Sequence, residues 1–418
     1  MREMKYSGFK WLGKIPKSWE LKRIKNFILE NVNKKRGVKE TDVLSLGIKG
    51  VSIKQDLSFG MNPTNYNDHN LVARGQYVIC LRDLDGPLLC GISPYNGCLS
   101  ALYYVLVLDE KNINKVFFNY VMKTMDNTRV IDAYSYGMRH SYNLLQFGNL
   151  RIPTPSILEQ QKIADYLDRK CGEIDSAMAD LQEQIDKLEQ YKRSVISEAV
   201  TKGLNQKAPM KDSGISWVGM MPANWDVRPL YYYFKEGKKR NSKCDENNLL
   251  SLSYGKIIRK DINMNGGLLP ASFSTYNIIE AGDIIIRPTD LQNDKRSLRT
   301  GLVLEHGIIT SAYIDLVPKG NVCSRYAHYL LHSYDVKKVF YNMGNGVRQG
   351  LNFSEFSKLM LCMPSLEEQQ EIADYLDKKC AEIESIMADK KQQLEVVEKY
   401  KKSLIYEYVT GKKEVSDE

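Results

Sequence analysis

The stretch EQQKIADYLDRKCGEIDSAMAD, residues 159–180, occurs a second time as EQQEIADYLDKKCAEIESIMAD, residues 368–389. The two copies are identical at 17 of 22 positions, which is more than a shared helical composition produces. Each copy follows a Pro-Ser pair whose Ser stands three residues before the first Glu. This Ser-x-x-Glu pattern is typical of a capping box, in which the Ser oxygen accepts the Glu amide and the Glu side chain reaches back to the cap. The sequence therefore predicts two related helices that begin at these positions.

Nothing breaks either predicted helix for roughly 45 residues, apart from an expected kink at Gly172, so each forms a rod of roughly 65 Å. Apolar residues at spacings of three and four indicate a coiled-coil seam. Antiparallel packing buries both seams and gives a tandem repeat pseudo-twofold symmetry, and we expect this arrangement. The seam residues are Ile174, Met178, Leu181, Ile185, Leu188 and Val195 in the first helix and Ile383, Met387, Leu394, Val397 and Leu404 in the second, with Lys192, Lys390 and Lys401 as interruptions.

Outward from these helices, a tryptophan motif also occurs twice, with an offset of 206 residues. All four tryptophans of the chain lie in it. Internal repeats of this kind decide the architecture before any local prediction does. The two copies are Ser7-Gly8-x-x-Trp11-x-Gly13-x-x-Pro16-x-x-Trp19 and Ser213-Gly214-x-x-Trp217-x-Gly219-x-x-Pro222-x-x-Trp225.

The repeat continues through the rest of each half. Leu44-Ser45-Leu46 returns as Leu250-Ser251-Leu252, and Gly137-Met138-Arg139 returns as Gly346-Val347-Arg348 with an offset of 209. The chain is therefore a tandem duplication, and each copy consists of a globular part followed by a helix. The expected divisions are a first globular domain at 1–155, a central helix at 156–204, a second globular domain at 205–363, a C-terminal helix at 364–411 and a tail at 412–418.

The two globular parts read as short strands separated by Gly, Pro, Asn and Asp, with one helix in each. They are predicted to be α+β or α/β globules. The strands are expected at Gln76–Leu81, Ala101–Leu108, Asp283–Arg287 and Ala312–Val317, and the helices at Val116–Thr124 and Arg325–Ser333.

Composition indicates a globular protein of more than one domain. The chain has 418 residues, of which 59 are Lys or Arg and 51 are Asp or Glu, giving a net charge of +8. It contains no apolar run near the roughly 18–20 residues that a membrane span needs, and no apolar segment of a secretory signal follows Met1. Its eight cysteines include no C-x-x-C pair, which argues against a zinc ribbon and fits reduced thiols. A cytoplasmic location is expected.

The positive charge is unevenly distributed. Residues 156–203 carry a net charge of −3 and residues 364–411 carry −4, which leaves +15 on the rest of the chain. Acidic helices repel phosphate and suit protein docking, whereas basic globules provide the positive potential that a nucleic acid needs.

Candidate catalytic motifs are weak. Gly344–Gly350 has one residue too many for a dinucleotide-binding loop, and no Walker motif is present. Asp226 with Glu236 and Lys238 superficially matches a metal-dependent nuclease, but the first copy lacks the Lys. His328 and His332 lack the Glu of zinc proteases, so packing or surface roles are expected. Cys171 and Cys380 are expected to be small core residues.

The recurring polar residues instead suggest DNA binding. Lys34-Lys35-Arg36 and Lys238-Lys239-Arg240 occupy matching positions, and their recurrence favours phosphate contacts over a merely solvated surface. A later loop in each copy combines aromatic residues with Arg, Asn and Gln, the side chains that read base edges. Its candidate readers are Arg139, Asn143, Asn345, Arg348 and Gln349, although pairing of each Arg with an acidic neighbour is an equal alternative.

The Trp-x-Gly-x-x-Pro-x-x-Trp openings and the Pro-Ser-x-x-Glu-Gln-Gln-x-Ile-Ala-x-x-Leu-Asp helix starts closely resemble the DNA specificity subunit of type I restriction-modification systems. The resemblance covers nearly the whole chain. The family usually has Pro-Pro at the helix start, whereas this chain has Thr154-Pro155 and Met363-Pro364, a minor departure.

The resemblance implies that each globule is a target recognition domain that reads one half of a bipartite, asymmetric site in double-stranded DNA. It implies that the helices set the spacer and dock two methyltransferase subunits, with endonuclease/translocase subunits joining the complex. The chain would have no active site, and S-adenosylmethionine, ATP and Mg²⁺ would belong to the partners. Candidate methyltransferase contacts are the helix-start residues Gln160, Gln161, Gln369 and Gln370, expected to be exposed.

Two other readings remain open at the level of sequence. One is a coiled-coil structural or regulatory protein with two protein-binding globules. The other, weaker one is a self-contained nuclease built on Asp226, Glu236 and Lys238. DNA binding that weakens steeply with salt would separate the specificity subunit from the first, and Mg²⁺-dependent cleavage by the isolated chain would support the second.

Overall fold

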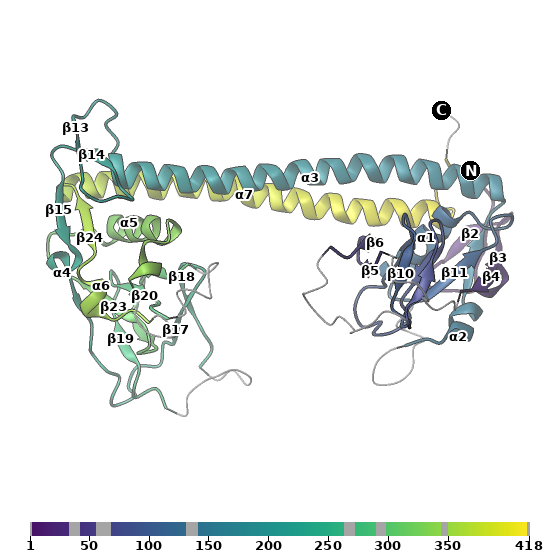
Figure 1. The fold of residues 1–418 in the computed structure, drawn as a ribbon, viewed down its shortest axis with the longest axis horizontal. Coiled ribbons are helices and arrows are strands. Elements are labelled where there is room, and N and C mark those ends of the chain that lie inside the picture. Colours follow the sequence, from purple (N-terminus) through teal and green to yellow (C-terminus); the bar gives the residue numbers. More distant parts are fainter. Residues whose placement is uncertain are drawn as a thin grey trace. The chain divides into compact units, whose positions relative to one another are not determined.

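The computed structural model describes residues 2–32, 42–55, 68–130, 141–262, 272–289, 298–343 and 350–415. The chain divides into two compact units (Figure 1). Unit 1 consists of Met1–Gln182 and Gln392–Glu418, and unit 2 consists of Glu183–Lys391. Each unit therefore combines one globular part with the beginning of one long helix and the end of the other.

The two long helices are α3 (Ile157–Lys202) and α7 (Leu366–Val409) (Figure 1). The prediction of two long, related helices is confirmed, and α3 continues as one helix through Gly172. None of the helices in the described ranges combines the length with the low charge that crossing a bilayer requires.

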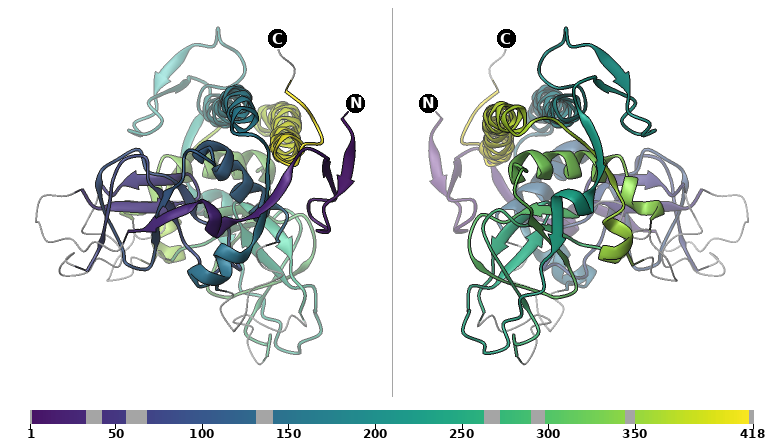
Figure 2. Two further views of the ribbon diagram at one scale, coloured as in Figure 1. Left: turned by 90° about the vertical axis from the view of Figure 1, so that its right-hand side faces the viewer. Right: turned by 90° about the vertical axis from the view of Figure 1, so that its left-hand side faces the viewer.

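Within each unit the two helix segments run antiparallel, as predicted. In unit 1, Ile163 and Leu167 near the start of α3 share one apolar cluster with Leu404 and Val409 at the end of α7. Seen end-on, α3 and α7 lie side by side above the globular part (Figure 2). In unit 2 the corresponding cluster contains Ile185, Leu188, Ile383 and Met387.

The three lysines that interrupt the seam bond across to the other helix. In unit 1, Lys401 Nζ lies 2.5 Å from Asp175 Oδ1. In unit 2, Lys390 Nζ donates to Gln184 Oε1 at 2.5 Å, and Lys192 pairs with Glu384. Each polar interruption therefore has a specific partner, which is how a coiled coil fixes register at some expense of apolar burial. The remaining seam positions Ile174, Met178, Leu181, Leu394 and Val397 are half-buried.

Antiparallel sheets form the globular part of unit 1. The largest sheet among its described residues has the order β4-β11-β8-β9. Short pairs β1-β2, β3-β12, β5-β6 and β7-β10 surround it. The strands are β1 (Met4–Tyr6), β2 (Lys14–Pro16), β3 (Glu20–Arg23), β4 (Ile28–Asn31), β5 (Leu44–Gly47), β6 (Gly50–Ile53), β7 (Asn70–Val72), β8 (Tyr77–Ile79), β9 (Cys90–Ile92), β10 (Gly97–Leu99), β11 (Tyr104–Leu108) and β12 (Arg151–Thr154), and the helices are α1 (Lys115–Asn127) and α2 (Leu144–Asn149).

Unit 2 repeats this topology strand for strand. Its largest described sheet has the order β16-β23-β20-β21, with the pairs β13-β14, β15-β24, β17-β18 and β19-β22 around it. The predicted α+β class and the predicted helix in each globule are confirmed. The elements are β13 (Met210–Asp212), β14 (Met220–Pro222), β15 (Asp226–Pro229), α4 (Leu230–Tyr233), β16 (Phe234–Glu236), β17 (Leu250–Ser253), β18 (Lys256–Arg259), β19 (Asn277–Ile279), β20 (Ile284–Ile286), β21 (Thr300–Leu302), β22 (Gly307–Ile309), β23 (Ile314–Pro318), α5 (Ser324–Val336), α6 (Phe353–Phe356) and β24 (Met360–Met363).

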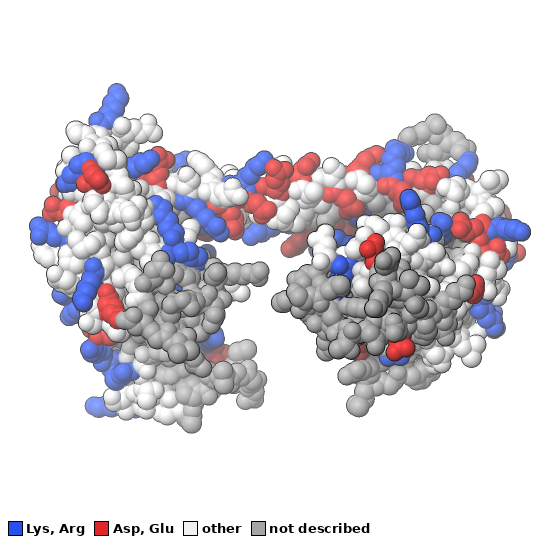
Figure 3. Space-filling model, in the orientation of Figure 1, with Lys and Arg blue, Asp and Glu red and all other residues white. Residues whose placement is uncertain are grey.

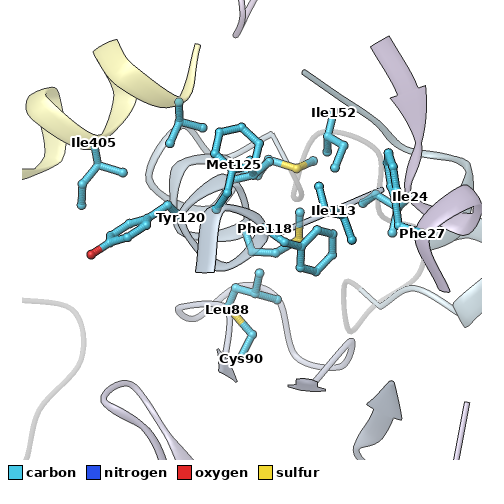
Figure 4. Close-up of a cluster of buried hydrophobic side chains, with 14 of the residues drawn as sticks. Ile24, Phe27, Leu88, Cys90, Ile113, Phe118, Tyr120, Met125, Ile152 and Ile405 are labelled. Carbon is cyan, nitrogen blue, oxygen red and sulfur yellow. The ribbon is translucent and has the colours of Figure 1, made fainter. Parts of the chain in front are cut away.

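The core of unit 1 joins its sheet to the helices through α1 (Figure 4). Phe118 of α1 packs edge-on against Tyr77 of the sheet, with ring centroids 5.0 Å apart. On the other side of α1, Tyr120 donates a hydrogen bond to Asp168 of α3 at 2.8 Å, and Ile405 of α7 lies beside Tyr120 in the same cluster (Figure 4). The equivalent tyrosine of unit 2, Tyr329 on α5, donates to Asp377 of α7 at 2.9 Å.

The two repeated motifs of the sequence meet in a buried hydrogen bond. Trp19 is fully buried, and its indole Nε1 donates to Glu159 Oε2 at the start of α3 at 3.1 Å. In unit 2, buried Trp225 donates to Glu368 Oε1 at the start of α7 at 3.0 Å. The tryptophan motif thus attaches each globule to the helix that follows it.

Because of this hydrogen bond, only half of the predicted capping box forms. The Ser half is present, because Ser156 Oγ accepts the Glu159 amide and Ser365 Oγ accepts the Glu368 amide, both at 3.3 Å. The carboxylates, however, accept the indole N–H groups rather than the cap amides. A buried indole N–H without an acceptor costs free energy. The cap amide can bond to water instead, so the Glu carboxylate bonds to the indole.

Replacing Glu368 with Ala removes the acceptor of the buried Trp225 N–H, so we expect unit 2 to lose about 1–3 kcal/mol of stability. Urea denaturation followed by Trp fluorescence measures the loss. Glu367→Ala is the matched control, because Glu367 is exposed in the same helical turn and its removal should cost only a few tenths of a kcal/mol, about what one charge near a helix N-terminus contributes. Equal losses in the two variants would contradict this role for Glu368.

Candidate nucleic-acid interface

The basic triplet of unit 2 lies directly after β16 in the largest sheet. Gly237 N donates to Asp315 O on β23 at 2.9 Å, and this bond extends the ladder to the foot of the triplet. Lys238, Lys239 and Arg240 then follow as exposed residues. The sheet therefore fixes the backbone position at which the three consecutive basic residues begin.

Each of these three side chains forms an ion pair or a hydrogen bond on the protein surface. Lys238 Nζ lies 2.8 Å from Glu236 Oε2, Lys239 Nζ lies 3.6 Å from Glu280 Oε1, and Arg240 donates to the Thr275 carbonyl at 2.5 Å. Exposed ion pairs contribute about 0–1 kcal/mol each, so the two lysines can exchange these carboxylates for another anion.

His306 lies beside the triplet, a position that the sequence did not indicate. Its Nε2 lies 2.8 Å from Glu246 Oε2 and its Nδ1 lies 2.7 Å from Glu280 Oε2. The hydrogen bond to Glu280 is the main reason that the pKa of His306 is raised above its ordinary value. Together with Lys239 and Arg240, His306 lines a hollow of about 380 Å³. A single His in a polar loop gives no signal by which sequence reasoning could find this arrangement.

Asn143 has a structural reason to recur in both copies. Its side-chain oxygen accepts the Gln146 amide at 2.8 Å and caps α2, and Asn352 caps α6 in the same way through Glu355 N at 2.9 Å. The recurrence that suggested a DNA contact is therefore explained by capping.

Several other predicted DNA-binding residues lie outside the described ranges. They are Lys34, Lys35, Arg36, Arg139, Asn345, Arg348 and Gln349.

The expectation that Gln160 and Gln369 are exposed contact residues is wrong. Both are buried, at 0% and 1% exposure. Gln160 accepts the Asn114 amide at 2.8 Å and donates to the Pro155 carbonyl at 3.0 Å, and Gln369 accepts the Cys323 amide at 2.8 Å. Backbone groups in loops need buried partners, and these amides supply them. Gln161 and Gln370 are exposed.

Of the three residues considered for a nuclease, Glu236 and Lys238 form an ion pair, and Asp226 belongs to another sheet. Asp226 lies on β15 and pairs with Arg228 at 3.9 Å, whereas Glu236 lies on β16 in a different sheet. In the described part of the chain, no group of three or more His, Cys, Asp or Glu side chains is arranged to hold a metal ion. Cys171 and Cys380 are buried thiols, as predicted.

The two histidines of α5 line a cavity of about 610 Å³ in unit 2. Burial lowers the pKa of His328 and of His332 to about 4, so both rings are neutral at pH 7. The cations that line the cavity are paired: Arg325 with Asp374 at 2.8 Å and Lys192 with Glu384. This is the packing role that the sequence suggested.

Comparison with known proteins shows what this arrangement resembles. A family model described as the type I restriction modification DNA specificity domain matches residues 303–396, which include α5 and α7 as far as residue 396. The type I restriction enzyme MjaVIII specificity subunit of Methanocaldococcus jannaschii is 24% identical over 429 residues, covering 96% of this chain and 94% of that protein. The MjaX specificity subunit of the same organism is 24% identical over 424 residues, covering 96% and 95%.

Over nearly its whole length the chain is similar to these type I specificity subunits. Solved structures show the same fold. A chain from a structure of complex assembly and conformational transition in a type I restriction-modification system has a TM-score of 0.69 at 13% identity, covering 94% of this chain and 98% of that one. The HsdS subunit of Thermoanaerobacter tengcongensis has a TM-score of 0.50 at 13% identity, covering 97% and 99%.

The two units differ sharply at one buried position. Asp315 on β23 is 2% exposed, and its Oδ1 has no hydrogen-bond partner among the described residues. Burial, with smaller contributions from the nearby charges of Asp283 and Glu236, raises the pKa of Asp315 to about 8. At neutral pH this carboxyl is therefore mostly protonated.

Unit 1 has an apolar pair in the same place. Val32 N donates to Val105 O at 2.7 Å, the bond that Gly237 and Asp315 make in unit 2. A Cβ on Gly237 would lie 1.8 Å from Asp315 Oδ2, so the glycine makes room for the carboxyl. The exchange of Val–Val for Gly–Asp is thus compensated sterically but not electrostatically. Aligning the two halves of the sequence could have found it.

Asp315→Val should stabilise unit 2 at neutral and alkaline pH. Because the pKa of Asp315 is raised in the folded state, the parent loses stability as pH rises from about 4 to about 8, with a slope near 1.4 kcal/mol per pH unit. Urea denaturation at pH 4.5 and pH 8 should show a parent-to-variant gap that widens by about 4 kcal/mol over this interval.

Asp315→Asn, which removes the charge but keeps the shape, should share the changed pH dependence. Parallel stability curves for the parent and both variants between pH 4.5 and pH 8 would contradict a buried, protonated Asp315.

Proposed function

We propose that this chain selects the DNA sequence on which a type I restriction-modification complex acts. The observation that carries the proposal is the whole-length similarity to specificity subunits of a chain whose tryptophan and helix-start motifs both occur twice. As a specificity subunit, the chain is a non-catalytic component of its complex.

Residues 1–155 and 205–363 are the two target recognition domains, and each reads one half of a bipartite, asymmetric site. Their frameworks agree, since the same strands pair in the same order. Their chemistry differs at matching positions, as the Val32–Val105 and Gly237–Asp315 pairs show. Asp315 is buried, so this exchange marks divergence within a common scaffold rather than a base contact.

The helical segments 156–204 and 364–411 set the distance between the half-sites. Readers that contact the same face of DNA must be spaced by about 34–36 Å per helical turn, and long helices provide a fixed spacing of that order. Acidic and basic side chains alternate along them (Figure 3), with a net negative charge in each. They are surfaces for two methyltransferase subunits, with Gln161 and Gln370 as exposed candidate contacts.

The partners supply the chemistry. The methyltransferase subunits would bind S-adenosylmethionine and methylate adenine N6, and restriction subunits would use ATP and Mg²⁺ for translocation and cleavage. Methylation requires the target base to leave the duplex. The recognition domains would grip the phosphates around that base, and the exposed Lys238-Lys239-Arg240 triplet would supply cations for this contact.

Mapping N6-methyladenine across a genome tests the proposal. Cells that express this chain with its methyltransferase partner should methylate nearly all copies of one split motif, and cells with the partner alone should not. Methylation without sequence preference in the presence of the chain would overturn the proposal.

Salt-dependent binding separates phosphate contacts from base contacts. Replacing Lys238, Lys239 and Arg240 with Ala should weaken binding of the methyltransferase complex to all sequences alike and reduce the slope of log Kd against log salt by about 2–3. Arg348→Ala should instead relax preference at one position, a loss of about 1–3 kcal/mol of discrimination. Equal effects of the two changes on cognate and unrelated DNA would contradict this division of roles.

A further inference from the structure

The turn between β17 and β18 presents a large apolar side chain to solvent. Tyr254 is 83% exposed, and its hydroxyl makes no hydrogen bond within the described part of the chain. Ile258 on β18 and Leu304 after β21 are exposed as well, and with Tyr254 they line the 610 Å³ cavity, whose other walls come from α3, α5 and α7. Exposed apolar side chains gathered in one place indicate a contact surface.

Tyr254 also occupies an unfavourable backbone conformation. Its φ is +46°, and that of the following Gly255 is +80°. A two-residue hairpin turn with positive φ at both positions is normally occupied by Asn-Gly or Asp-Gly. A bulky aromatic residue at the first position is strained, and such strain persists where a side chain has a role outside the fold.

The base of this hairpin is packed tightly, so the tip is rigidly held. A Cβ on Gly301 of β21 would lie 2.6 Å from Leu252 and 2.9 Å from Ile257. A Cβ on Gly307 of β22 would lie 2.8 Å from Leu250. Both strands of the hairpin therefore rest directly on the backbone of their neighbours. A side chain inserted into a partner needs this kind of support.

Unit 1 also has an exposed apolar side chain at the tip of the matching hairpin, without the positive φ of Tyr254. The residue that matches Tyr254, with the offset of 206, is Ile48 in the turn between β5 and β6, and it is 77% exposed. A Cβ on Gly97 of β10 would lie 2.7 Å from Leu44, so this hairpin has the same close-packed base. Two different sequences thus keep a large apolar tip.

A lysine accompanies each tip. Lys49 follows Ile48 directly and is exposed. Lys256 lies two residues after Tyr254, is also exposed, and is only loosely paired with Glu384 at 3.8 Å. An apolar side chain next to an ammonium group fits a DNA groove, where the base step or sugar accepts the apolar group and the phosphate accepts the charge. Lys49 lies in the turn and Lys256 begins β18, so a positive charge recurs beside the tip at a different position in each copy.

We propose that the two hairpin tips are DNA wedges. Tyr254 and Ile48 insert against base steps of the target duplex and unstack them, while Lys256 and Lys49 bind the adjacent phosphates. This inference rests on the proposed function and adds a sequence-tolerant contact to each recognition domain, distinct from the basic triplet.

The test uses the complete complex with its methyltransferase subunits and DNA that carries the mapped motif. Tyr254→Asn should raise Kd about tenfold, with an unchanged slope of log Kd against log salt, because an apolar contact releases no counterions. Lys256→Ala should instead reduce that slope by about one. DNA with 2-aminopurine at successive positions should fluoresce strongly at one step with the parent complex and not with Tyr254→Asn.

Protein stability separates this effect from unfolding. Asn tolerates positive φ, so the melting temperature of Tyr254→Asn should equal or exceed that of the parent although DNA binding falls. Tyr254→Phe, which keeps the ring, should bind as the parent does. Tyr231→Asn is the matched control, because Tyr231 on α4 is exposed in the same unit, and it should leave Kd unchanged.

Two outcomes are distinguishable. Parental Kd and fluorescence in Tyr254→Asn, with a parent complex that still prefers its motif, would overturn the wedge and leave the proposed function intact. A parent complex that shows no preference for any motif would overturn the proposed function itself.

Discussion

One buried hydrogen bond connects the parts of each unit: the indole N–H of a fully enclosed tryptophan donates to a carboxylate in the first turn of a long helix. The tryptophan belongs to the segment that opens a globule, and the glutamate belongs to the helix that leaves it. Because an indole N–H has only one proton to donate and cannot reach water here, the carboxylate position is fixed. The direction in which the helix departs from the globule follows from that constraint.

The C-terminal end of the other long helix packs against the same tryptophan. Gly411, just past the end of α7, has φ of +71°, and a Cβ there would lie 2.5 Å from Pro16 and 3.0 Å from Trp19. Gly203 after α3 stands in the same relation to Trp225 and Pro222. Each tryptophan thus contacts the start of one helix and the end of the other, which explains why a short motif had to be duplicated together with the long helices.

Sequence reasoning succeeded where a pattern is periodic or repeated, and failed where a contact joins distant segments. The helices, their antiparallel pairing and the α+β globules follow from spacing and duplication. The partner of Glu159 does not, because a capping box and a bond to Trp19, 140 residues away, have the same local sequence. Gln160 and Gln369 read as surface residues because amides usually are, yet two loop amides needed buried acceptors. His306 and Asp315 owe their properties to neighbours brought together only by the fold.

The order in which the segments of the two units occur along the chain affects how they fold during synthesis on the ribosome. Unit 2 is one continuous stretch, Glu183–Lys391, whereas unit 1 takes its last segment from Gln392–Glu418. Leu404, Ile405, Tyr408 and Val409 complete the core that begins near Leu12. The N-terminal globule is therefore translated before unit 2, but its core is completed only after all residues of unit 2 have been translated. Until the final residues emerge, its apolar surface stays open, and a chain shortened at its C-terminus damages the domain at its opposite end.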